Sequence, residues 1–382
     1  MTEERSPMKR LVSVLTTICI IFTIVVGAFM VANFRNVVRM VEVGLLVKTQ
    51  SLKPVDSNLL LEGAVRGMVD SLEDPYSSFM TKNEFLEMQR YIQGSIGGIG
   101  IYVGIKDNTI VVQAPIEGTP AAKAGILSED IIVKINDTFT ADLKYDEAVT
   151  MMRGDPGTQV KISIMRQGAN KLLEFTLTRE IIDLPTVSSE VLKDHPDIGY
   201  LRLRMFASNS DEALAQELKK LQDQSIKGLI LDLRDNPGGD LESAVNIAKN
   251  FVPKGPVVFT VDRGGVTHTY ESQEEPSFKA PVVILINGGS ASASEVLAGA
   301  MKDTKVGTLV GEKTFGKGIV QAIFPLGGGD GLKLTTSKYL TPNKVDIHEK
   351  GIEPDVAIAP NANQTEDLQL KKALEVLLTK IK

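Results

Sequence analysis

The chain has 382 residues, of which 43% are hydrophobic and 24% are charged, so it exceeds one typical domain and has ordinary globular composition. Its net charge of -6 excludes a broad nucleic-acid-binding surface, which needs clustered positive charge. One cysteine excludes a disulfide framework and a cysteine-based zinc site, and the three histidines show no metal-ligand spacing. We therefore expect no nucleic-acid partner, no metal and no cofactor.

The first predicted element is a membrane-spanning segment at residues 11–33. Residues 11–32 are almost entirely Leu, Val, Ile, Phe and Ala, and about 20 such residues cross a bilayer. Lys9 and Arg10 precede it and predict a cytoplasmic tail over residues 1–10, with the rest of the chain outside the cytoplasm of a bacterial cell. The apolar run is longer than the core of a usual signal peptide, and no A-x-A site follows it. We therefore expect an uncleaved signal anchor in the cell membrane rather than a cleaved leader.

A helical segment is predicted over residues 34–93. Apolar residues from Leu61 to Leu72 recur every three or four positions and form one face of a helix. A similar amphipathic pattern returns in a C-terminal helix predicted over residues 361–382. Each apolar face could pack on the core of its own chain or on a partner chain, and the sequence does not decide between them. Because both faces exceed what a single helix buries unaided, we expect a homo-oligomer.

Short alternating strands and turns replace this pattern over residues 94–182. A loop of Gly98, Ile99, Gly100 and Ile101 precedes an alternating strand, and the block G-T-P-A-A-K-A-G-I-L-S-E-D-I-I follows. A glycine loop alone is typical of any turn, but the two motifs together resemble a PDZ domain. The resemblance implies a mainly-β module whose loop donates backbone N–H groups to a C-terminal carboxylate.

Apolar strands alternate with helices over residues 183–360, which predicts an α/β layered domain. Residues 282–286 form a continuous apolar run, residues 228–233 are apolar except for Asp232, and helices are expected over residues 241–251 and 293–302. The overall prediction is an α/β core combined with a mainly-β module, a helical segment and an N-terminal anchor.

Two glycine-rich blocks in this region carry candidate chemistry. The block N-G-G-S-A-S-A-S-E (287–295) lies where a strand ends and a helix begins, where small residues admit a substrate backbone and free N–H groups stabilise developing negative charge. Alone it is equally typical of a capped turn. The block G-E-K-T-F-G-K-G-I-V-Q (311–321) places Lys317 between two glycines. A serine nucleophile needs a base, and with G-x-S-x-G absent and no histidine similarly placed, this lysine is the candidate, since burial would lower the pKa of its ammonium.

Three blocks occur in the order found in the carboxyl-terminal processing, or tail-specific, peptidase family: L-D-L-R-D-N-P-G-G-D-L, N-G-G-S-A-S-A-S-E and G-E-K-T-F-G-K-G-I-V-Q. The resemblance covers most of the chain after the anchor and implies a ClpP/crotonase-like peptidase core. It implies Ser292 as nucleophile, Lys317 as base and Gln321, one helical turn beyond the lysine, as the residue that orients it. Position alone does not separate Ser292 from Ser290 and Ser294, whereas the family pattern does.

The same resemblance implies backbone N–H groups of Gly238 and Ala293 as oxyanion donors. It implies a serine endopeptidase that takes protein or peptide substrates with free C-termini and cuts them through an acyl-enzyme. Similar enzymes place an arginine near the loop that holds Lys317 and Gln321. We therefore expect Arg153 to carry the signal of a bound tail to this loop. The alternative is a catalytically idle PDZ-bearing binding or scaffold protein, because the same α/β core occurs in a retinoid-binding relative. The intact catalytic blocks favour the enzyme.

Overall fold

The computed structural model describes residues 16–17, 20–21, 23–24, 27–28, 31–106, 109–169, 171–359 and 366–381. The chain divides into two units, Met1–Pro75 and Tyr76–Lys382. The membrane span expected over residues 11–33 lies largely outside the described residues. Among the residues that are described, no helix combines the length and the apolar character needed to cross a bilayer.

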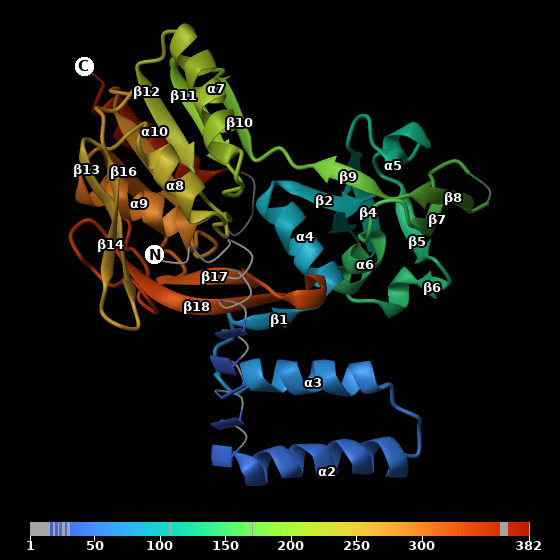
Figure 1. Ribbon diagram of the computed structural model, residues 1–382. Helices are drawn as coiled ribbons and strands as arrows, with labels where there is room; N and C mark the ends of the chain where they lie inside the picture. The colour runs from blue at the N-terminus through green and yellow to red at the C-terminus, as the bar shows by residue number, and fades with distance from the viewer. Residues whose placement is uncertain are drawn as a thin grey trace, which may run out of the picture. The chain divides into compact units, whose positions relative to one another are not determined.

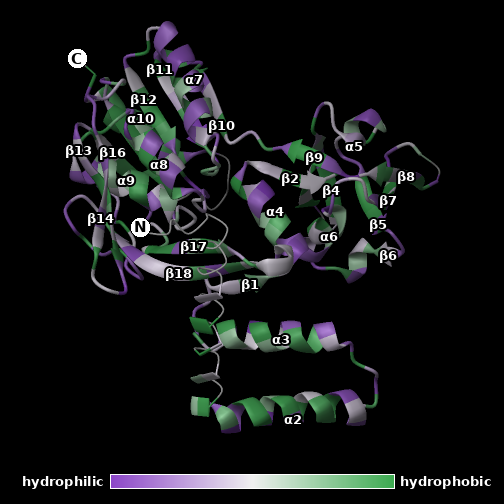
Figure 2. Ribbon diagram, in the orientation of Figure 1, coloured by the Kyte–Doolittle hydropathy of each residue, from purple (hydrophilic) through white to green (hydrophobic). Residues whose placement is uncertain are grey.

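Two helices dominate the first unit, α2 (Phe34–Gln50) and α3 (Ser57–Asp70). The Asp56 side chain accepts a hydrogen bond from the Asn58 N–H and caps the start of α3. Apolar residues extend along both helices (Figure 2). Leu61 and Met68 are exposed, whereas Val69 is buried. The apolar face predicted on this segment is therefore largely exposed in the single chain.

The second unit contains a β-rich module whose antiparallel strands follow the order β3-β4-β5-β7-β8, with β6 paired to β5. Its elements are β3 (Ile101–Lys106), β4 (Thr109–Pro115), α5 (Pro120–Lys123), β5 (Ile131–Ile135), β6 (Thr138–Phe139), α6 (Tyr145–Met152), β7 (Gln159–Met165) and β8 (Leu173–Thr178). A separate two-stranded ribbon, β2 (Ser95–Gly98) with β9 (Glu180–Asp183), lies at its two chain ends. Because β3 ends the strand order, one edge of this strand is not paired within the described sheet.

A six-stranded sheet with the order β10-β11-β12-β15-β16-β19 forms the α/β core. Its strands are β10 (Val187–Leu192), β11 (His195–Leu203), β12 (Gly228–Asp232), β15 (Val282–Ile286), β16 (Gly307–Gly311) and β19 (Val356–Ala357). All pairs from β11 to β19 are parallel, and β10 is antiparallel to β11. Every residue of β12 and β15 is buried. A central parallel strand is covered on both faces, which explains why both sequences are apolar except for Asp232 at the end of β12.

Helices cover both faces of this sheet (Figure 1). The helices α7 (Ser210–Asp223), α8 (Leu241–Ala248) and α9 (Ala293–Asp303) share one core cluster with Leu229 and Ile284, whereas α10 (Leu368–Leu378) packs through Leu377 against Ile230 and Val283 on the other face. The apolar face of the C-terminal helix is therefore buried by its own sheet. This is one of the two arrangements expected for the helix, packing on the core or on a partner.

A second sheet is centred on β18 (Gly331–Leu340), which pairs with β1 (Ser78–Met80), β13 (Gly255–Asp262) and β17 (Ile319–Pro325); β14 (Thr267–Ser272) pairs with β13. The helix α4 (Lys82–Ile92) precedes β2. Gln321 lies within β17, so its expected position one helical turn beyond Lys317 is wrong. The β-branched and aromatic residues around Gln321 favour a paired strand.

Candidate active site

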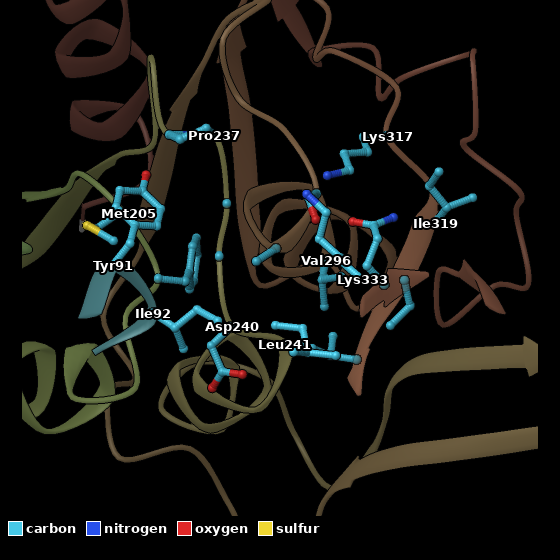
Figure 3. A pocket seen from close by; sticks show the side chains of 18 of the residues that line it. Tyr91, Ile92, Met205, Pro237, Asp240, Leu241, Val296, Lys317, Ile319 and Lys333 are labelled. Atoms are coloured by element: carbon cyan, nitrogen blue, oxygen red, sulfur yellow. The ribbon is translucent and has the colours of Figure 1, made fainter. Parts of the chain in front are cut away.

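A cavity of about 310 Å³ brings together all five residues expected to take part in catalysis. Its wall includes Gly238, Ser292, Ala293, Lys317 and Gln321. They come from the turn before α8, the start of α9, the loop before β17 and β17 itself, and α4 and β18 complete the wall (Figure 3). The three sequence blocks therefore meet at one place, although 69 residues separate the end of the first block from the start of the last.

Ser292 occupies a strained turn between the buried strand β15 and the helix α9. Its φ of 55° and ψ of -115° are unusual for a residue other than glycine, and such a conformation persists only where the surroundings hold it. Both neighbouring serines are fully buried and supply that support. Ser290 Oγ donates to the Leu233 carbonyl at 2.8 Å, and Ser294 Oγ donates to the Asn236 carbonyl at 2.9 Å. Ser292 alone of the three lines the cavity.

The Lys317 ammonium lies over the Tyr76 ring, with Nζ 4.7 Å from the ring centroid. An aromatic face attracts a cation, and this contact favours the protonated amine. The hydrogen bonds of the described residues include none between Lys317 Nζ and Ser292 Oγ. Gln321 Nε2 donates to Thr335 Oγ1 at 3.4 Å. The expected serine–lysine pair thus shares a cavity, but its proton-transfer hydrogen bond is not formed in this structure.

The Glu295 carboxylate joins the nucleophile turn to the lysine loop. It is fully buried and accepts the backbone N–H groups of Ser292 at 2.9 Å, Gly316 at 2.8 Å and Lys317 at 2.9 Å, together with the Thr314 hydroxyl at 2.6 Å. Sequence reasoning missed this residue, although an acidic residue three positions after a helix-capping serine is a recognisable signal. One side chain therefore fixes the relative position of the Ser292 turn and the Lys317 loop.

Tyr339 of β18 makes a second connection between the same segments. Its hydroxyl is shared between the backbone carbonyl oxygens of Ser292, at 2.9 Å, and Lys317. Burial, together with the negative charge of Glu295, raises the pKa of the Tyr339 phenol well above its usual range, so it stays a neutral donor. No local motif marks this tyrosine, and only the pairing of β18 brings it to the site.

The turn at Gly238 packs directly on the nucleophile turn. Its φ is +97°, and a Cβ added there would lie 2.6 Å from the Ala291 carbonyl oxygen and 2.8 Å from the Ala293 nitrogen, so only glycine fits. The Gly238 N–H, expected as an oxyanion donor, instead donates to Asn236 Oδ1 at 2.9 Å. A substrate oxygen must therefore displace this side chain to use it. Ala293, the other expected donor, opens α9 at the cavity wall.

A second cavity, of about 190 Å³, lies between the open edge of β3 and the helix α6. It is lined by every residue expected to bind a substrate tail, namely Gly98, Ile99, Gly100, Ile101 and Arg153. Arg153 lines this groove and is absent from the described wall of the catalytic cavity. The expected role of Arg153 in carrying a signal to Lys317 and Gln321 stays a prediction.

Comparisons with known proteins agree with this arrangement. Residues 197–358 match the model of peptidase family S41, residues 97–177 match a PDZ domain, and residues 31–84 match the N-terminal domain of the activating protease CtpB. The chain is 40% identical over 334 residues to the carboxy-terminal processing protease CtpB of Bacillus subtilis, covering 87% of this chain and 70% of that protein. It is 37% identical over 324 residues to the carboxyl-terminal-processing protease of Synechocystis sp., covering 82% and 76%.

Among solved structures, the photosystem II D1 C-terminal processing protease superposes with a TM-score of 0.54 at 32% identity, covering 87% of this chain and 90% of that one. The fold, the PDZ domain and the similarity over most of the chain agree with one another. This chain belongs to the carboxyl-terminal processing serine proteases of peptidase family S41.

Proposed function

We propose that this protease is anchored in the membrane, acts outside the cytoplasm, and cuts polypeptides with free C-termini through an acyl-enzyme on Ser292, with Lys317 as the general base. The observation that supports it most directly is the shared cavity of Ser292, Lys317 and Gln321, in which the serine sits on a strained turn at a helix N-terminus. The hydroxyl groups of the neighbouring Ser290 and Ser294 both donate hydrogen bonds to backbone carbonyls.

In the proposed reaction, Lys317 leaves the Tyr76 ring, loses its proton and forms a hydrogen bond with Ser292 Oγ. The hydroxyl gives its proton to Nζ while Oγ attacks the substrate carbonyl carbon. The oxyanion accepts the Ala293 N–H and, once Asn236 is displaced, the Gly238 N–H. When the tetrahedral intermediate collapses, the C–N bond of the substrate breaks, and Lys317 gives the proton to the leaving amine. A water molecule, deprotonated by the same amine, then hydrolyses the ester.

Cleavage of an unfolded protein, followed on a gel, tests these roles. Ser292→Ala and Lys317→Ala each abolish cleavage in this proposal, because nucleophile and base act as a unit. Lys313→Ala is the matched control, since Lys313 lies in the same loop but pairs with Glu353 at 2.9 Å. Turnover by either folded dyad variant would show that the assignment is wrong.

The groove between β3 and α6 is proposed to hold the substrate tail. An extended peptide adds a strand to the open edge of β3, and its terminal carboxylate takes the N–H groups of residues 98–101. A peptide with a free apolar C-terminus is then cut faster than the same peptide with an amidated C-terminus, and Arg153→Ala reduces the difference between the two rates. Equal rates for both peptides with the unaltered enzyme would contradict tail recognition.

Membrane anchoring and oligomerisation complete the proposal. The apolar sequence of residues 11–33 supports an anchor, and the exposed Leu61 and Met68 of α3 support pairing of chains. The full chain should remain with membranes after an alkaline wash, and a chain lacking residues 1–33 should be released. Light scattering of that shortened chain should show a dimer or larger. Release of the full chain, or a monomer throughout the micromolar range, would contradict the respective point.

A further inference from the structure

A second lysine, Lys333, lines the catalytic cavity with Ser292 and Lys317. It lies on β18, where it is paired with Ile323 of β17 on one side and with Ser78 of β1 on the other. A residue within a strand that is paired on both sides has a fixed side-chain direction, because side chains alternate between the faces of a sheet. Figure 3 shows the Lys333 and Lys317 side chains entering the cavity from different segments.

No acidic side chain of the described residues forms an ion pair or a hydrogen bond with Lys333, which is partly buried. Among the described residues of the cavity wall, Asp240 is the one with a carboxylate. This carboxylate accepts a hydrogen bond from the Ser243 N–H at 3.0 Å and caps α8. Its carboxylate points away from Lys333 (Figure 3). Much of the remaining wall is apolar, with Met205, Val296 and Ile323 among its residues. A partly dehydrated ammonium in such surroundings gains from an anion that arrives with a ligand.

We infer that Lys333 forms a subsite for a substrate carboxylate next to the bond that is cut. Lys317 does not serve this purpose in the proposed reaction, because a base must be neutral when it accepts the serine proton. The inference rests on the proposed function and adds a specificity determinant to it. The carboxylate comes either from a Glu or Asp side chain beside the scissile bond or from a chain end that lies within the cavity, and both sources offer the same chemistry.

Matched peptides distinguish the two sources. One series keeps a constant C-terminal tail and carries Glu or Gln at each position flanking the cut, whose place is established by mass spectrometry. A second series ends one to three residues after the cut, as the acid or the amide. We expect kcat/KM to favour the charged member about tenfold in one series, equivalent to about 1.4 kcal/mol. Lys333→Met brings that ratio to about one, whereas Lys333→Arg retains most of it.

Lys338→Met provides the matched control, because Lys338 lies on the same strand but pairs with Asp346 at 3.0 Å and does not line the cavity. It should leave the ratio unchanged. Because each ratio compares two peptides with one enzyme preparation, a partial loss of folded enzyme cancels. Ratios near one in both series for the unaltered enzyme, or a ratio that Lys333→Met leaves intact, overturn the inference. Cleavage of the Gln peptide that disappears in Ser292→Ala would show in the same experiment that the protease assignment itself holds.

Discussion

Replacing Glu295 by glutamine tests whether its carboxylate holds the nucleophile and base segments together. The substitution keeps the shape of the side chain but converts one acceptor oxygen into an NH₂ donor. The fully buried carboxylate accepts four hydrogen bonds, two at each oxygen: Thr314 Oγ1 and Gly316 N–H at Oε1, and Ser292 N–H and Lys317 N–H at Oε2.

The amide has one favourable orientation. With its NH₂ group toward Thr314, the threonine hydroxyl can rotate and accept the new donor, although it already accepts the Ile352 N–H at 2.7 Å. The amide oxygen then keeps Ser292 and Lys317, and the Gly316 N–H loses its partner. A buried donor without a partner costs about 1–3 kcal/mol, and the loss of charge weakens the bonds that remain. We expect a loss of about 2–3 kcal/mol in the free energy of unfolding and a fall of roughly 5–10 °C in Tm.

Thermal unfolding monitored by circular dichroism, together with kcat and KM, measures the effect. We expect kcat to fall more than tenfold with a smaller change in KM, because the altered Gly316–Lys317 segment carries the base rather than the substrate-binding groove. Glu242→Gln is the control, since Glu242 lies in the first turn of α8 but is exposed, and it should change stability by less than about 0.5 kcal/mol. Unchanged Tm and kcat in Glu295→Gln would refute the reasoning.

Three further predictions concern contacts around the site. Tyr339→Phe leaves the Lys317 carbonyl without its phenol donor and should cost about 1–2 kcal/mol in unfolding free energy, with kcat reduced; an unaltered denaturation curve would contradict this. Tyr76→Leu removes the ring that attracts the Lys317 ammonium and should raise kcat, because the lysine leaves this ring before it reacts in the proposed mechanism; an unchanged kcat would count against it. Burial raises the pKa of Asp367, but hydrogen bonds, first among them the one from Arg234, outweigh burial and lower this pKa in the folded protein. Asp367→Asn should therefore be less stable than the unaltered chain above about pH 4, where the unfolded carboxyl is charged. The stabilities of the two proteins should become equal as the pH falls below the pKa of Asp367 in the folded protein. A difference in stability that persists in strong acid would contradict that last prediction.

Local sequence predicted the strands and helices of the core and the segments that meet at the cavity. The apolar runs at residues 228–233, interrupted only by Asp232, and 282–286 predicted strands that lie buried in the centre of a parallel sheet, because such strands are covered by helices on both faces. The three glycine-rich blocks predicted the chain segments that meet at the cavity, since the proposed nucleophile, base and oxyanion turn each need small neighbours. The paired glycine motifs likewise predicted the module whose groove lies beside β3.

Contacts between distant segments required the tertiary structure. Periodicity shows which face of an element is apolar but not what covers it, so the burial of α10 by its own sheet was not predictable. Spacing did not show that Gln321 lies on a strand, because four residues suit either a helical turn or part of a paired β-ribbon. Glu295 and Tyr339 reach Ser292, and Lys333 reaches the wall of the same cavity, only through helix capping and the pairing of β18. An isolated acid, phenol or amine has no local signature. Their roles are decided by the neighbours that folding gives them, since a charge or a hydroxyl acquires its chemistry from burial and partners.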